Sequence, residues 1–229
     1  MAPLALLYDV HGNLAALRAV LDDARGQGAA RFLLGGDYAL FGPWPQETVA
    51  ALRELPEARW IRGNGERWTA FAAQAPDDPV VQGAIAACRE SLGPETVSQL
   101  AALPETASDD GVVYCHGSPA SDVRSFMPEP ADDEAELLEG VSAQRLVFGH
   151  THLPFRRVAG GGVELVNPGS VGMPFDGDPR AAYALVADEG YVEHRRVPYD
   201  HLGAAADVRE RFTGEWRQTV GRRIERAAF

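Results

Sequence analysis

The chain has 229 residues, of which 45% are hydrophobic and 24% charged, so it can bury the core of one large domain or two small ones. Its 33 acidic residues outnumber 21 basic ones, and the net charge of -12 argues against non-specific binding to DNA or to anionic membranes. No apolar stretch is long enough to span a bilayer, and Cys88 and Cys115 are too few and too far apart to indicate a disulfide scaffold. We therefore expect a cytoplasmic protein with reduced thiols and no membrane partner.

The first third of the chain predicts alternating strands and helices. Strands are expected over residues 4–8, 31–34 and 58–61, and helices over residues 13–25 and 45–56. This β-α-β-α-β order favours parallel strands joined by right-handed crossovers. Each strand is followed by Asp or Asn close to glycine, and sites in open α/β sheets form at the carboxyl ends of strands.

The remaining two thirds predict a helical segment, a second set of strands and a tail. Residues 66–104 are expected to form a mostly helical excursion without an obvious ligand set, and residues 200–229 a charged, helical tail. The strands between them are expected over residues 112–115, 145–148, 155–158, 163–166, 182–186 and 191–197. Hairpins are expected at residues 160–162 and around Glu189-Gly190. Since no linker or internal repeat is evident, we expect one domain over residues 1–229.

The segment Phe148-Gly149-His150-Thr151-His152 places two imidazoles one residue apart, directly after a short apolar strand. Crowded imidazoles repel one another when charged and need partners when neutral, and a metal ion can accept a nitrogen lone pair from each ring. Four other loops that follow predicted strands also carry metal ligands. These loops are Asp9-Val10-His11, Gly36-Asp37, Gly63-Asn64 and His116-Gly117.

Together, the five loops predict a site for divalent metals. They hold four of the six histidines, whereas His194 and His201 lie elsewhere and are expected at the surface. A mixture of carboxylate, imidazole and amide ligands suits ions such as Mn²⁺, Fe²⁺, Co²⁺ or Zn²⁺. Seven ligand side chains are too many for one ion and suit two, which can share a hydroxide and hold a phosphoryl group for in-line attack.

The order Asp-x-His, Gly-Asp, Gly-Asn, His-Gly and Gly-His-x-His resembles the calcineurin-like metallophosphoesterases, from Tyr8 to about Val186. Three further stretches, at residues 9–13, 41–43 and 166–172, resemble the small bacterial phosphodiesterase branch of that family. The resemblance implies a four-layer α/β/β/α sandwich of two mixed sheets flanked by helices. The residue pattern alone indicates only an α/β fold with an early parallel sheet and late hairpins.

The resemblance also implies a role for each motif residue in holding two divalent metal ions. Asp9, His11 and His152 would hold one ion, and Asp37 would bridge both. A bridging carboxylate offers two oxygens and a negative charge that offsets the repulsion between the cations. Mn²⁺ is the expected metal, with Fe, Zn, Co or Ni as alternatives.

The other ion would be held by Asn64, His116 and His150. A hydroxide that bridges the ions would attack phosphorus, so Asp37, Asn64 and His116 are also predicted to be catalytic through metal and phosphate positioning.

The third motif departs from the family pattern. Family members commonly continue Gly-Asn-His-Asp or Gly-Asn-His-Glu, and that histidine is often the proton donor or stabilises the transition state. Here the sequence is Gly63-Asn64-Gly65-Glu66, without an imidazole. Three interpretations stay open: Arg62, Glu66 or Arg67 assists instead; the enzyme favours good leaving groups, which need little protonation; or catalysis is weak or lost.

Two residues are considered for substrate binding, each with a structural alternative. Tyr8 could stack on a base or pack in the core, and Asn13 could bind a phosphate oxygen or, as we favour, cap a helix. The turn at residues 167–170 could lie beside the site or only connect strands. Four aromatic residues, for which core packing is the better expectation, are considered as walls for a nucleobase: Phe41, Trp44, Trp68 and Phe126.

The sequence thus predicts a dinuclear metal-dependent phosphoesterase that acts on a small phosphorylated substrate, with a nucleotide as one candidate. The missing imidazole favours phosphodiesters over monoesters. A metal-retaining nucleotide-binding or regulatory module is the first alternative. A nuclease is the second, and the net charge and the lack of a basic patch disfavour nucleic acid as a partner.

Overall fold

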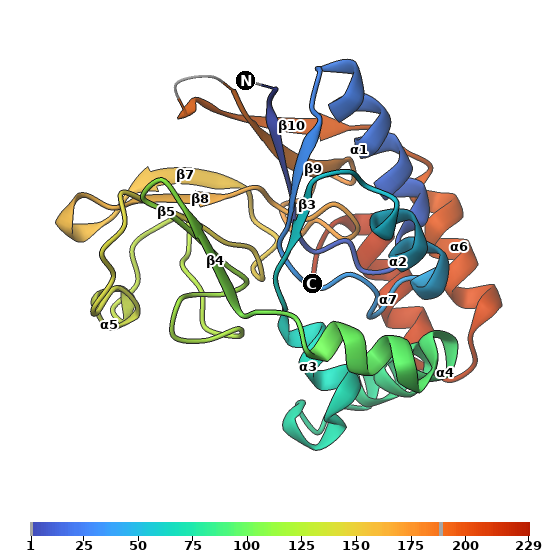
Figure 1. Ribbon diagram of the computed structural model, residues 1–229. Helices are drawn as coiled ribbons and strands as arrows, with labels where there is room; N and C mark the ends of the chain where they lie inside the picture. The colour runs from blue at the N-terminus through green and yellow to red at the C-terminus, as the bar shows by residue number, and fades with distance from the viewer. Residues whose placement is uncertain (1, 188–189) are drawn as a thin grey trace.

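The computed structural model describes residues 2–187 and 190–229, and its strands form two mixed five-stranded sheets (Figure 1). The first sheet contains β1 (Leu4–Leu7), β2 (Arg31–Leu34), β3 (Ala58–Trp60), β9 (Ala181–Val186) and β10 (Val192–Val197). The second sheet contains β4 (Thr106–Asp109), β5 (Val112–Cys115), β6 (Arg145–Val147), β7 (Phe155–Val158) and β8 (Glu164–Asn167). The strand orders are β10-β9-β1-β2-β3 and β4-β5-β6-β8-β7.

Seven α-helices occur in the described residues, and most of them gather beside the first sheet (Figure 1). They are α1 (Leu14–Gly26), α2 (Pro45–Arg53), α3 (Asn64–Ala70), α4 (Pro79–Ala101), α5 (Glu134–Leu137), α6 (His201–Arg211) and α7 (Trp216–Arg226). Two 3-10 turns, η1 (Ala72–Gln74) and η2 (Gly160–Gly162), complete the set. The single turn of α5 lies beyond the second sheet, at the opposite side of the molecule from α6.

The predicted β-α-β-α-β unit is present. β1 pairs with β2 and β2 with β3, both in parallel, so the carboxyl ends of these three strands lie along one edge of the sheet. α1 crosses from β1 to β2 and buries Leu17 and Val20, whose spacing is helical. Parallel pairing therefore places the residues that follow β1, β2 and β3 next to one another.

The backbone forms four layers, and three clusters of buried apolar side chains lie between them. Ala5 and Leu7 of β1 pack with the helices, whereas Leu6 belongs to a cluster between the sheets, because side chains alternate along a strand. On the outer face of the second sheet, Leu146 packs with Leu137 of α5 and with loop residues. The expected four-layer sandwich is confirmed, and its outermost layer consists mostly of loops.

The pattern of apolar residues predicts the late hairpins but not an exposed edge strand. β7 and β8 form the expected antiparallel hairpin at residues 160–162, and β9 pairs with β10 in the same way. The turn expected around Glu189 lies outside the described residues. β4 was not predicted, because Thr106–Asp109 is polar and mostly exposed, so no apolar alternation marks it as a strand on the edge of the sheet.

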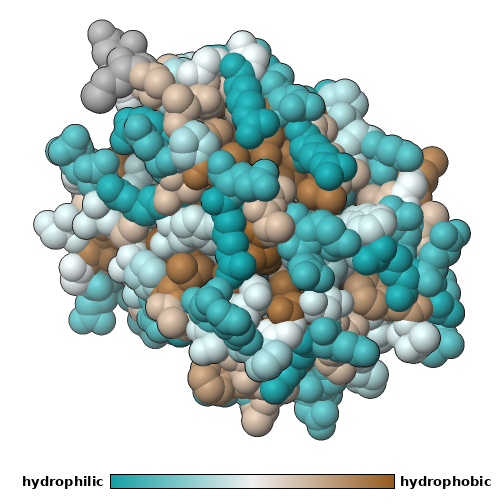
Figure 2. All heavy atoms as spheres, turned by 45° about the vertical axis from the view of Figure 1, so that its right-hand side comes forward, coloured by the Kyte–Doolittle hydropathy of each residue, from teal (hydrophilic) through white to brown (hydrophobic). Residues whose placement is uncertain are grey.

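The excursion and the tail are helical and pack together on the first sheet's side. α4 is kinked at Gly93, where φ is 71°, and α7 packs on both α4 and α6. Figure 2 shows polar side chains spread over one face of the molecule, with small apolar patches between them. Within the described part of the chain, no helix is both long and apolar enough to cross a membrane. Cys88 and Cys115 are buried free thiols.

Candidate metal centre and active site

The five predicted ligand loops come together at one place. They follow β1, β2, β3, β5 and β6, so both sheets contribute. Backbone hydrogen bonds join neighbouring loops: the Asp9 N–H donates to Gly36 O at 3.2 Å, and the Gly149 N–H donates to His116 O at 2.7 Å. The predicted ligands that meet here are Asp9, His11, Asp37, Asn64, His116, His150 and His152.

Three of the four histidines have a hydrogen bond that selects which ring nitrogen is free. His11, His116 and His152 place Nδ1 at 2.9, 2.8 and 2.5 Å from the carbonyl oxygens of Leu40, Gly35 and Met173. A carbonyl only accepts, so Nδ1 carries the proton and donates it. The Nε2 lone pair of each ring is then available to a metal ion.

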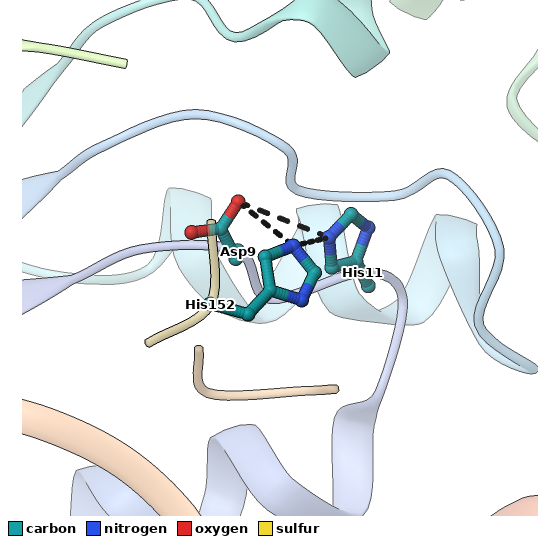
Figure 3. Close-up of side chains that lie close together, drawn as sticks. All are labelled: Asp9, His11 and His152. Atoms are coloured by element: carbon teal, nitrogen blue, oxygen red, sulfur yellow. Dashed lines mark hydrogen bonds and ion pairs between the residues drawn. The ribbon is translucent and has the colours of Figure 1, made fainter. Parts of the chain in front are cut away.

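The first ligand group is Asp9, His11 and His152, whose side chains point toward one another (Figure 3). The Nε2 atoms of His11 and His152 are 3.0 Å apart, and Asp9 Oδ1 lies 3.8 and 3.4 Å from them. Because both Nδ1 atoms donate elsewhere, two bare lone pairs face each other. Asp9 Oδ1 is buried and has no hydrogen-bond partner among the described residues. A cation between these atoms would satisfy all three, so the group fits a metal ion.

The second ligand group adjoins the first. His116 Nε2 lies 3.4 Å from Asp37 Oδ1, and Asn64 Oδ1 lies 2.9 Å from both His116 Nε2 and His150 Nδ1. An amide oxygen and two imidazole lone pairs repel at this distance unless a cation or a proton lies between them. A reversed Asn64 amide would supply the proton by donating to both rings. In the orientation described, the amide oxygen would face a bound cation, as the lone pairs of the first group would.

The two groups share their carboxylates. Asp37 reaches both, since its Oδ2 lies 3.9 Å from His11 Nε2 and its Oδ1 contacts His116. Asp9 does the same, because its Oδ1 lies 3.8 Å from His116 Nε2. The described residues thus offer two adjacent Asp/His triads, and both include Asp9. The arrangement fits a dinuclear metal centre.

Burial sets the protonation of the cluster. It lowers the pKa of His11 to about 3 and the pKa of His150 to about 4, so both rings are neutral at physiological pH. Burial raises the pKa of Asp37 to about 7; His116 opposes this rise and the carboxylate of Glu66 adds to it. Neutral imidazoles are ready to bind a metal, whereas Asp37 is only partly ionised near neutral pH and loses its remaining proton when a cation binds.

The backbone at the ligands is unusual. Asp9, His11, Asp37, His150 and His152 have φ between 51° and 68°, in the left-handed region that non-glycine residues rarely adopt. Such conformations cost about 1–3 kcal/mol each and cluster at functional sites. This backbone geometry cannot be predicted from the residue types in the motifs.

Two glycines are required by close approach. Gly36 has a φ of 93°, and a Cβ there would meet Gly63 N at 2.6 Å and His116 Nδ1 at 2.8 Å. A Cβ on Gly65 would meet Asp37 Oδ1 at 2.8 Å. In its absence the Gly65 N–H donates to that oxygen at 2.6 Å.

Residues 3–190 match the model of the calcineurin-like phosphoesterase superfamily domain, which covers most of the chain. The chain belongs to the calcineurin-like phosphoesterase superfamily. It is 28% identical to an uncharacterized protein of Methanocaldococcus jannaschii, over 93% of this chain and 94% of that protein.

Two solved structures extend the comparison. A metallophosphoesterase from Sphaerobacter thermophilus superposes with a TM-score of 0.82 at 28% identity and covers 99% of both chains. A hypothetical protein from Pyrococcus horikoshii superposes with a TM-score of 0.81 at 20% identity, over 96% of this chain and 98% of that one, which supports the fold. The family, the fold and the buried Asp/His cluster together confirm that the chain is a phosphoesterase.

Two catalytic candidates of this phosphoesterase turn out to be structural. Glu66 is buried and accepts three backbone N–H groups, from Asp37 and Gly63 at 2.9 Å and from Tyr38 at 2.8 Å. Arg62 donates to Ala101 O at 3.1 Å and pairs with Glu105, at the side of α4. The suggestion that Arg62 or Glu66 replaces the motif imidazole is therefore not supported, because both side chains are engaged elsewhere.

Both substrate-binding candidates are also structural. The fully buried Tyr8 ring lies between the sheets, and its hydroxyl donates to Val147 O at 3.1 Å. Asn13 is the N-cap of α1, where its Oδ1 accepts the Ala16 N–H at 3.2 Å, and its Nδ2 donates to Gly172 O at 2.8 Å. Neither side chain is free to contact a substrate: Tyr8 packs in the core, and Asn13 caps the helix, as favoured from the sequence.

The turn at residues 167–170 braces the metal loops. Asn167 Nδ2 donates to Gly149 O at 3.2 Å and to Thr151 Oγ1 at 2.9 Å. Ser170 Oγ donates to Asp9 O at 2.8 Å. This turn therefore lies beside the site and holds the segment that carries His150 and His152.

A cavity of about 700 Å³ opens beside the metal centre, lined by ligands and by apolar side chains. Phe41 and Trp68 line it, as considered from the sequence. Trp44 does not, since its Nε1 donates to Asp207 Oδ2 at 3.1 Å, and Phe126 is buried behind the second sheet. Phe175, which lies in no motif, also lines the cavity and stacks on His152 with ring centroids 4.4 Å apart.

Proposed function

We propose that this phosphoesterase hydrolyses phosphodiesters of small molecules with two divalent ions bound, Mn²⁺ first among the candidates. The observation that carries the proposal is the pair of adjacent ligand groups, in which bare lone pairs and the unpartnered Asp9 oxygen converge. When bound, the ions would supply an activated water and neutralise the charge of the phosphoryl group.

The residues of the chain would hold these ions and fix their positions. Asp9, His11 and His152 form the first group, with Asp37 between the groups. The rings of His11, His116 and His152 are oriented by Nδ1–H bonds to backbone carbonyls, which keep each Nε2 aimed at the centre. Asn64, His116 and His150 form the second group.

Position 65 supports the preference for diesters. It has no imidazole, and Arg62 and Glu66 are engaged in structural contacts. Hydrolysis of a monoester with a poor leaving group would suffer most without an acid to protonate it. In addition, the cavity beside the metal centre has apolar walls that can hold the second ester group of a diester.

A comparison of two chromogenic substrates tests the proposal. With Mn²⁺ present, we expect bis-p-nitrophenyl phosphate to be hydrolysed with a higher kcat/KM than p-nitrophenyl phosphate. Asp37→Asn should lower the rate at least a hundredfold, whereas His201→Ala, outside the site, should not. If neither substrate is hydrolysed with Mn²⁺, Fe²⁺, Co²⁺, Ni²⁺ or Zn²⁺, the proposal is wrong. Tight nucleotide binding without product formation would then favour a regulatory module. Faster hydrolysis of the monoester would contradict only the diester preference.

A further inference from the structure

The C-terminal helix contributes to the cavity beside the metal centre, although it lies beyond the residues that match the family model. Residues 3–190 match that model, whereas Arg223 of α7 and Phe229 line the cavity. Figure 1 shows the chain returning after α7 to the middle of the molecule, where residue 229 lies. The tail thus reaches the site that the earlier part of the chain builds.

A continuous row of rings connects the metal centre with Arg223. Phe175 stacks on His152 at 4.4 Å between centroids, with an interplanar angle of 14°. Phe229 meets Phe175 edge-on at 5.6 Å. The Arg223 guanidinium carbon lies 3.9 Å from the centroid of the Phe229 ring. Two aromatic rings, Phe175 and Phe229, therefore lie between Arg223 and a metal-ligand histidine.

Arg223 stacks on Phe229 but is paired with no carboxylate among the residues that the structure describes. It is the only Arg among the residues that line the cavity, and the chain contains no lysine. Within residues 2–187 and 190–229, its guanidinium makes no ion pair, and its Nε is buried without an acceptor. Asp78, the nearby carboxylate in the lining, instead caps α4 by accepting the N–H groups of Val80 and Val81 at 2.8 and 3.0 Å.

A second donor in the same lining is also unsatisfied. Trp68 Nε1 is buried and has no acceptor among the described residues. Trp68 Nε1 and Arg223 Nε are both covered by protein atoms, so the terminal nitrogens of Arg223 are the donors left for a ligand that brings acceptors. The walls between them are aromatic and aliphatic, which suits a flat apolar group.

We propose that α7 is the substrate-recognition element of this phosphoesterase and that Arg223 binds an acceptor on a nucleobase-sized ester group. The inference rests on the proposed function and names its substrate class, a nucleoside phosphodiester. The phosphate lies at the metal centre, the base lies against the aromatic wall, and a base carbonyl or ring nitrogen accepts from Arg223. Guanidinium groups combine stacking on rings with planar hydrogen bonding, which suits this position.

Two substrates with the same leaving group test the inference. Thymidine 5′-(p-nitrophenyl phosphate) carries a base, whereas methyl p-nitrophenyl phosphate does not, and both release p-nitrophenol. We expect wild-type protein to prefer the thymidine ester in kcat/KM by at least tenfold. Arg223→Gln should reduce that preference about tenfold, mainly through KM, because a charge-assisted hydrogen bond is lost. Arg222→Gln, a neighbour whose guanidinium donates to Thr219 Oγ1 at 2.9 Å, is the matched control and should keep the preference.

Calorimetric titration with thymidine 5′-monophosphate gives a readout that does not depend on turnover. Arg223→Gln should weaken its affinity about tenfold and Arg222→Gln should not. Hydrolysis of both esters without preference, or equal losses on both in Arg223→Gln, would overturn the inference and leave the proposed function standing. Failure to hydrolyse either ester with any of the metals would overturn both.

Discussion

The backbone N–H of Gly65 donates to Asp37 Oδ1 at 2.6 Å, at the position where family members commonly have a histidine. The contact holds one oxygen of the carboxylate that lies between the two ligand groups. A side chain at position 65 would crowd this contact, because a Cβ there would meet Asp37 Oδ1 at 2.8 Å. Four predictions follow from this and other contacts.

Restoring the histidine should not improve the enzyme. In Gly65→His, the new Cβ would lie 2.8 Å from Asp37 Oδ1 and displace it. We expect metal affinity to fall about tenfold, as for other residues that orient ligands, and hydrolysis of bis-p-nitrophenyl phosphate to fall with it. Calorimetric titration with Mn²⁺ measures the affinity. Gly26→Ala, where a Cβ meets nothing within 4 Å, is the control. A more active Gly65→His variant would show that Asp37 can move without loss.

Glu66→Gln should destabilise the fold and loosen the metal loops. Glu66 accepts N–H groups from Asp37, Tyr38 and Gly63, and an amide offers only one accepting oxygen. We expect a loss of about 1–3 kcal/mol in the free energy of unfolding. Urea denaturation of EDTA-treated protein measures it. The exposed Glu95, changed to Gln, should cost far less, and equal losses in the two variants would contradict the role of Glu66.

Metal binding should stabilise the wild-type protein against heat, and His152→Ala should lose most of this effect. At free Mn²⁺ a hundredfold above Kd, binding to the folded state alone contributes about 2.7 kcal/mol. Without metal, His152→Ala should cost little, because it removes one of two lone pairs that face each other at 3.0 Å. Differential scanning calorimetry with Mn²⁺ and with EDTA tests both parts. An equal gain in Tm for His152→Ala and wild type would remove His152 from the ligand set.

Asp23 should stabilise the fold at neutral pH but not in acid. Its hydrogen bond from Arg195 is the main cause that lowers the pKa of Asp23, against a smaller effect of burial, and Tyr183 contributes in the same direction as Arg195. A depressed pKa in the folded state means that the unfolded chain binds the proton first. The stabilisation is therefore present above about pH 4, the ordinary range of Asp, and is lost as pH falls through the folded-state pKa.

The comparison of wild type with Asp23→Asn tests this linkage. For a partly exposed pair, we expect a difference of at most about 1 kcal/mol in the free energy of unfolding at pH 7, shrinking as pH falls through the lowered folded-state pKa of Asp23. Urea denaturation of both proteins in EDTA gives the difference. A gap that widens in acid would contradict the assigned sign.

The sequence predicted the parts of the site that depend on residue type and position along a strand. The seven ligands converge because parallel strands end at a common edge and because His and Asp are recognisable metal ligands. Backbone partners could not be predicted, since any residue at positions 35, 40 or 173 has the carbonyl that orients His116, His11 or His152. Glu66 was noticed for its charge, yet its contacts with three main-chain groups depend on the loop geometry.

In the fold, too, elements that depend on residue type could be predicted, and those that depend on backbone pairing or tertiary packing could not. Apolar strands such as Arg31–Leu34 and Val112–Cys115 have the predicted bounds, because burial requires their composition. Thr106–Asp109 was missed, because an exposed edge strand needs only backbone pairing. Tyr8 could not be assigned from the sequence, since an aromatic residue after a strand suits a pocket as well as the layer between two sheets. Arg223 lies far from every motif, and only tertiary packing brings it to the cavity.

The left-handed backbone at five ligands has a consequence for metal exchange. Main-chain hydrogen bonds join the loops that hold these five residues. When a metal binds to ligands that the backbone already positions, little binding free energy is lost in ordering the chain. The protein should therefore release one ion and accept another while it stays folded, and the choice among metals should follow the supply in the cell and the rigid spacing of the donors.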